Sequence, residues 1–153
     1  MATERTGQSP EGTRAALART IGQWTEGIED RATPIADLLF FRREAPTPPG
    51  ICRVEPSIVL VVQGEERMLA GDDAYAYDVD HFLLASLDVP ASSQVIEASP
   101  KRPCLGLTLK LDLRLLAELV PQVRLAPRED RRVAAKGMAL GAVTPTLLES
   151  FRR

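Results

Sequence analysis

The single histidine of the chain, His81, is the first candidate for chemistry, because imidazole can act as a general base or as a metal ligand. Two carboxylates, Asp78 and Asp80, precede it closely. A histidine-based metal site needs two or three imidazoles, however, and Asp is favoured in turns because its side chain bonds to the nearby backbone. We therefore interpret residues 78–81 as a turn that leads into a strand, and we expect no metal site.

Serine and cysteine side chains become nucleophiles only with an activating partner. The serines occur in no GxSxG elbow, and His81 is the single imidazole available to any of them. Cys52 and Cys104 lie far apart and outside a CxxC spacing, which argues against a zinc knuckle, a redox pair or a disulfide scaffold. Gly-rich phosphate loops do not occur, and the carboxylate pair Glu65-Glu66 is expected to be solvated in a turn. We therefore expect no catalytic residue, no cofactor and no enzymatic activity.

One charged pair, Arg53 and Glu55, could instead bind a ligand. Strand alternation gives these two side chains the same facing as Ser57 and Val59. If that face lines a cavity, a guanidinium and a carboxylate within an apolar barrel would fix the orientation of a small molecule. The alternative is a partly exposed ion pair at the rim of a barrel, which would contribute little to stability.

The composition limits the partners that such a site could serve. The length of 153 residues is that of one domain, with 44% hydrophobic and 26% charged residues. Lys and Arg number 19 against 21 Asp and Glu, so the formal charge is -2 and direct binding to nucleic acid is not expected. Neither a signal-peptide pattern nor an apolar run of roughly 18 residues occurs, so we expect a cytoplasmic protein that contacts no membrane.

The elements that position these residues are predicted to be mainly β strands. Residues 1–12 are polar and predict a flexible arm, and residues 13–32 predict a helical lead-in. Its apolar side chains recur at helical spacing: Leu17, Ile21, Trp24 and Ile28. Residues 33–111 then predict a β-barrel or sandwich, because short apolar runs alternate with turn residues. The predicted strands are 35–43, 57–63, 66–70, 74–78, 81–87, 93–98 and 104–111.

The C-terminal residues 112–153 predict a helical segment. Asp112 is a good N-cap for a first helix, and Thr144-Pro145 is a typical start for a second one. That second helix would have only about two turns, so we interpret the chain as a fragment of a longer protein. Apolar side chains of two helices could form a dimer interface: Trp24, Leu113, Leu116 and Val120.

Several blocks of the sequence resemble the N-terminal domain of AraC-type bacterial transcriptional regulators. The blocks are EPSIVLVVQG at 55–64, YD at 77–78, HFLL at 81–84 followed by Ser86, Asp88 and Pro90, and EASP at 97–100. Their order and spacing are specific to one subfamily, and the similarity covers roughly residues 33–153. The resemblance implies a cupin-like β-barrel (a jelly roll) followed by helices. It also implies an unknown small-molecule effector, a homodimer, and DNA contact only through a separate C-terminal domain absent from this chain.

The resemblance to cupins also bears on metals. Metal-dependent cupins carry their ligands at positions that correspond here to Ile51, Arg53, Ser57 and a site near Ala91. None of these side chains is a good metal ligand, so this comparison also predicts no metal.

Strand alternation assigns eight side chains to the effector pocket, and a shift by one residue would turn the whole set outward. Arg53 and Ser57 are placed at its mouth, and the lining consists of Val59, Val61, Leu84, Ser86, Val95 and Leu107. Two alternatives remain open. One is a pure dimerisation module whose barrel is filled by side chains, and the other is a small cupin-like enzyme, which would require a metal.

Overall fold

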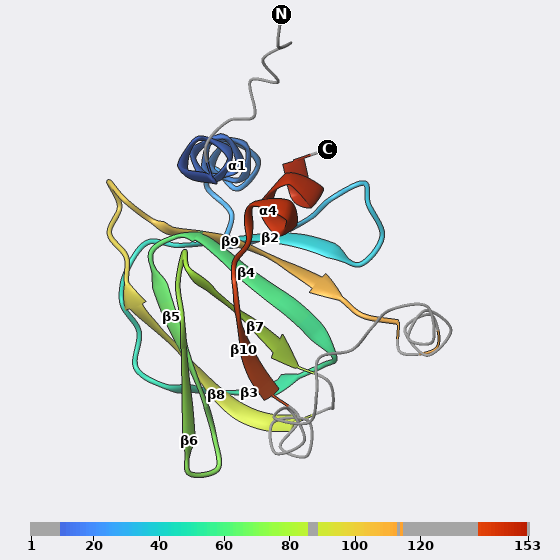
Figure 1. The fold of residues 1–153 in the computed structure, drawn as a ribbon. Coiled ribbons are helices and arrows are strands. Elements are labelled where there is room, and N and C mark those ends of the chain that lie inside the picture. Colours follow the sequence, from blue (N-terminus) through green and yellow to red (C-terminus); the bar gives the residue numbers. More distant parts are fainter. Residues whose placement is uncertain (1–9, 86–88, 113, 115–137, 153) are drawn as a thin grey trace, which may run out of the picture.

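The computed structural model describes residues 10–85, 89–112, 114 and 138–152, in which ten strands form two antiparallel sheets (Figure 1). The six-stranded sheet contains, in spatial order, β1 (Asp30–Ala32), β2 (Leu38–Arg43), β9 (Cys104–Lys110), β4 (Ser57–Gln63), β7 (His81–Ala85) and β10 (Met138–Ala142). The four-stranded sheet contains β3 (Gly50–Val54), β8 (Val89–Glu97), β5 (Glu65–Ala70) and β6 (Asp73–Tyr77). The expected mainly β, cupin-like fold is confirmed.

The main apolar core lies between the two sheets. Val59 and Val61 from β4 and Leu83 from β7 meet Met68 and Val95 from the opposite sheet. All of these side chains are at least nine-tenths buried. The interior of the domain is therefore filled largely by its own side chains over most of its length.

A second apolar core lies on the outer face of the six-stranded sheet. Helices α1 (Pro10–Trp24) and α4 (Pro145–Arg152) lie together over this face (Figure 1). Leu17 and Ile21 from α1 and Leu148 from α4 pack against strand residues that include Leu60 and Leu107. The strands beneath the helices are thus buried on both faces, which is why their sequences are almost continuously apolar.

Helix α1 ends earlier than the sequence predicts. The helical lead-in was expected over residues 13–32, but the helix spans Pro10–Trp24 and β1 occupies the end of that range. Thr25 closes the last turn, since its amide and its hydroxyl both donate to the carbonyl oxygen of Ile21. Gly27 then adopts a φ of 74°, a left-handed conformation that stops a helix. Ile28, expected on the helical stripe, is 44% exposed.

Two further strands lie where none was predicted. The sequence predicted no strand over residues 50–54, yet they form the edge strand β3, which pairs with β8. Residues 138–142 were assigned to a helical segment, yet they form β10, which pairs with β7 along its full length. The helix after β10 begins as the Thr-Pro pair predicts, because Thr144 Oγ1 accepts a hydrogen bond from the amide of Leu147 at 3.1 Å. No helix within the described residues is long and apolar enough to span a membrane.

Gly106 in β9 lies at a point of very close packing in the six-stranded sheet. A Cβ atom at this position would lie 2.3 Å from Phe41 Cζ and 2.5 Å from the carbonyl oxygen of Leu60. Because one of these neighbours is backbone, the clash cannot be relieved by a change of rotamer alone.

We predict that Gly106→Ala lowers the free energy of unfolding by about 2 kcal/mol or more, measured by urea unfolding. The matched control is Gly22→Ala in α1, where the new Cβ would lie 3.6 Å from Leu105 Cδ1, an ordinary contact. This control is expected to stabilise the protein by roughly 0.5–1 kcal/mol, because alanine favours a helix. Equal stability of Gly106→Ala and the native protein would contradict the packing described.

Candidate functional site

A cavity of about 330 Å³ opens at one end of the interior, between the two sheets. We call it the mouth cavity. Residues from β3, β4 and β9 and from the β3–β4 turn line it: Arg53, Val54, Glu55, Ser57, Val59, Thr108 and Lys110. Val54 and Val59 belong to the main core and supply the apolar part of the lining. Its volume lies in the lower part of the range of small-molecule sites.

Charged groups surround the opening of the mouth cavity. Lys110 Nζ lies 3.7 Å from Glu55 Oε2, and both side chains are well exposed, so this pair is weak. Arg53 is exposed and forms no ion pair within the part of the chain that the structure describes. The Ser57 hydroxyl is buried and donates to the Glu55 carbonyl oxygen at 2.9 Å. Two cations therefore face one carboxylate, which leaves a net positive rim.

The structure places four of the predicted pocket residues on the inner side of the barrel, while Arg53 borders the mouth cavity from β3, where its neighbours Cys52 and Val54 take the inner side. Arg53, Ser57 and Val59 line the mouth cavity. Val61 and Val95 face the same interior but are packed in the main core. Ser86 lies outside the described residues. That any of these side chains binds an effector stays a prediction.

The expected facing of two other residues is wrong. In β7 the buried core residues are Leu83 and Ala85, so Leu84 between them points to the opposite face. In β9, Leu107 is 1% exposed and belongs to the core beneath the helices. The sequence prediction assigned the wrong face of each strand to the interior. Both faces of these strands are apolar, so the alternation of polar and apolar residues does not indicate which face is inside.

Thr108 and Lys110 line the mouth cavity and were missed by the sequence reasoning. They face inward because β9 places Cys104 and Gly106 on its inner side, four and two residues before Thr108. The polar Thr108 within an otherwise apolar strand was the available signal.

The predicted dimerisation residues are only partly described. Trp24 packs within this domain, since its ring meets Phe40 edge to face at a centroid distance of 5.9 Å. The guanidinium of Arg31 lies 5.3 Å from the centroid of the same ring. Leu113, Leu116 and Val120 lie outside the described residues.

A buried polar cluster lies at the other end of the interior, because Cys104 and Lys110 occupy opposite ends of β9. The hydroxyl of Tyr77 donates to Glu66 Oε2 at 2.7 Å, and Cys104 Sγ lies 3.9 Å from Glu66 Oε1. Glu66 was expected to be solvated, but it is 9% exposed. Burial raises the pKa of Glu66 above its ordinary value, although the Tyr77 hydrogen bond and the charge of Arg43 oppose this effect.

The same environment makes the buried thiol unreactive. Burial, followed by the nearby Glu66, raises the pKa of Cys104 far above its ordinary range, so the thiol stays protonated.

At the histidine, Asp78 Oδ1 accepts hydrogen bonds from the amides of Asp80 and His81 at 2.9 and 3.1 Å, which confirms the predicted turn. The described residues include no group of three or more His, Cys, Asp or Glu side chains that could hold a metal ion.

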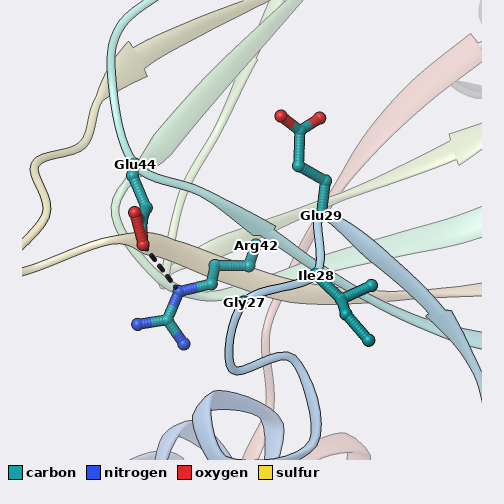
Figure 2. Close-up of a pocket in the computed structure, with 5 residues that line it drawn as sticks. All are labelled: Gly27, Ile28, Glu29, Arg42 and Glu44. Atoms are coloured by element: carbon teal, nitrogen blue, oxygen red, sulfur yellow. Dashed lines mark hydrogen bonds and ion pairs between the residues drawn. The ribbon is translucent and has the colours of Figure 1, made fainter.

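A second hollow, of about 260 Å³, lies outside the barrel beside the end of α1 (Figure 2). Arg42 is already engaged there, because its Nε lies 3.3 Å from Glu44 Oε1 and its Nη1 donates to the Gly22 carbonyl oxygen at 3.0 Å. Figure 2 shows the side chains of Ile28 and Glu29 pointing away from this guanidinium. The mouth cavity is therefore the better candidate for a binding site.

We predict a pH dependence of stability from Glu66. The pKa of this carboxyl is raised in the folded state above the ordinary 4.5. Its contribution to the free energy of unfolding is therefore fully present below about pH 4.5 and is lost as the pH rises through the folded-state pKa. Glu66→Gln cannot ionise, so the variant should gain stability relative to the native protein over that window, by at most about 1.4 kcal/mol per pH unit. Urea unfolding between pH 4.5 and 8 measures this difference.

The matched control for that experiment is Glu65→Gln, a half-buried neighbour on the same strand. A stability difference between Glu66→Gln and the native protein that stays constant with pH would contradict a raised pKa at this carboxyl.

Comparison with known proteins agrees with the fold. A family model described as the AraC-type transcriptional regulator N-terminus matches residues 34–153. A search of curated protein sequences gave no match.

Two solved structures of ToxT from Vibrio cholerae strain SCE256 are similar to this chain at 8% sequence identity, which shows the fold alone. An apo form of a ToxT variant has a TM-score of 0.54 and covers 78% of this chain and 47% of the ToxT chain. An unsaturated fatty acid-bound wild-type form has a TM-score of 0.50 and covers 75% and 43%. The chain thus spans about half the length of the ToxT chains. Because the family model covers well over half of the sequence, this chain belongs to the family of AraC-type transcriptional regulator N-terminal domains.

Proposed function

We propose that this domain senses a small amphipathic anion, such as a medium-chain carboxylate, and passes that signal to a DNA-binding domain elsewhere in the full-length regulator. The mouth cavity carries this proposal, because it combines an apolar lining with a positive rim. A ligand can regulate only by binding two states of the protein unequally. Such a regulator would act in the cytoplasm as a homodimer, would contact DNA only through the other domain, and would catalyse no reaction.

The arrangement of charges favours an anion over a cation. A carboxylate at the opening would meet Arg53, which has no ion-pair partner among the described residues, and could be shared by Lys110. An ammonium group would meet these two cations and find only Glu55, which Lys110 already contacts. The apolar part of the ligand would lie against Val54 and Val59. The fatty acid in one ToxT structure supports a carboxylate ligand in this fold.

A pure dimerisation module remains the second candidate, because the core side chains fill most of the interior. The ring of Phe41 packs against Gly106, and Met68 and Tyr77 are buried in the same core. Binding measurements separate the two candidates, since a filled barrel would bind nothing.

We predict that octanoate raises the melting temperature of the isolated domain and that octanol and octylamine raise it much less. Arg53→Gln should weaken octanoate binding by about tenfold or more, because a hydrogen bond to a charged group contributes about 1.5–3 kcal/mol. Thermal shift at several ligand concentrations gives the affinities. The matched control is Arg19→Gln, an exposed arginine on α1 that is expected to leave binding unchanged.

Equal stabilisation by octanol and octanoate would contradict an anion site. If no member of the series stabilises the intact domain, the dimerisation module with a filled barrel is the better account.

A further inference from the structure

The strands β4 and β9 separate the mouth cavity from the helices. On β4, Val59 lines the cavity, whereas its neighbour Leu60 is 0% exposed and belongs to the core beneath α1 and α4. On β9, Thr108 lines the cavity, whereas Leu107 belongs to that same helix-facing core. Along each strand, residues that line the cavity therefore alternate with residues that support the helices.

The register of the two strands aligns these contacts. Val59 is paired with Thr108, and Leu60 is paired with Leu107. The pair that faces the cavity is thus followed directly by the pair that faces the helices, about 3.4 Å further along the strands. A ligand that displaces the first pair must displace the second as well, because the two share one backbone.

The packing around these pairs leaves little room to absorb such a displacement. Gly106 packs so closely on the Leu60 carbonyl oxygen and on the ring of Phe41 that even one extra methyl group would clash. The ends of the strands are fixed as well, since the amide of Lys110 donates to the Asp37 carbonyl oxygen at 2.9 Å and that of Leu111 to Pro56 at 2.9 Å. Close-packed interiors transmit a shift rather than dissipate it.

The helix on the receiving side is well placed to carry a signal. Leu148 of α4 is 1% exposed and packs in the same core as Leu60 and Leu107. Thr13 of α1 contacts Glu149 of α4 through a hydrogen bond of 3.4 Å. The four-stranded sheet contributes no residue to this core among the described residues. Only one wall of the mouth cavity therefore supports the helices.

We propose that β4 and β9 couple the mouth cavity to the helix layer, so that an occupant of the cavity changes how α4 packs against α1. The coupling rests on the proposed sensing function, and it names the path by which that site regulates the rest of the protein. The helix layer responds to the Val59–Thr108 wall and is insensitive to the opposite wall of the barrel.

A double-mutant cycle tests this coupling without any ligand. Val59→Ala is combined with Leu148→Ala, and in a matched cycle Val95→Ala is combined with Leu148→Ala. Val59 and Val95 are 8% and 6% exposed and share the main core, but Val95 lies on β8 in the sheet that does not support the helices. Unfolding equilibrium constants from urea denaturation give the two coupling factors.

We expect the Val59 cycle to depart from additivity by about threefold or more and the Val95 cycle to be additive within about twofold. Additivity in both cycles, or the same departure in both, would overturn the coupling. If a double variant does not fold, amide hydrogen exchange of α4 in the single variants decides. Val59→Ala should accelerate this exchange at least about threefold more than Val95→Ala does, and equal acceleration would overturn the proposal.

These outcomes are separate from those of the sensing function. Coupling can fail while octanoate still binds, in which case only the path is wrong. If octanoate fails to bind while the Val59 cycle is coupled, the path exists but its ligand class is wrong.

Discussion

Burial of β4 and β9 on both faces organises the molecule. Leu60 and Leu107 point outward into the core beneath the helices, while Val59 points into the space between the sheets. Water is excluded from both faces of these strands, so each strand contributes hydrophobic stabilisation on both of its faces. The helices and the four-stranded sheet are consequently held by the same pair of strands. Gly106 sets how closely these strands and Phe41 approach one another.

The polar groups of the interior are separated to its two ends. At one end, Glu66 and Tyr77 are satisfied by each other and closed to solvent, and the raised pKa of Glu66 reflects the cost of burying a carboxylate. At the other end, Arg53 and Lys110 stay exposed around the mouth cavity. A closed polar cluster supports the fold, whereas exposed charges beside an apolar lining can exchange water for a ligand.

The sequence predicts the existence of most strands more securely than it predicts which side chains face inward. β4 was predicted with the bounds that the structure shows, because Pro56 and Gly64 delimit its apolar run. The facing of Leu84 and Leu107 was wrong because their strands are apolar on both faces, which removes the period-two signal. The burial of Glu66 could not be predicted from the residues around it in the sequence either, since its hydrogen-bond partner Tyr77 comes from the neighbouring strand β6.

The account depends most on where a carboxylate ligand binds, and NMR titration of the labelled domain with octanoate measures this directly. We predict that the largest chemical shift changes occur at the backbone amides of Ser57, Val59 and Thr108, with smaller changes at the amide of Leu148 in α4. Amides of Val61 and Val95, deeper in the same core, should change little. Shift changes centred on Arg42 and Glu44, beside the hollow outside the barrel, would contradict the mouth cavity as the binding site.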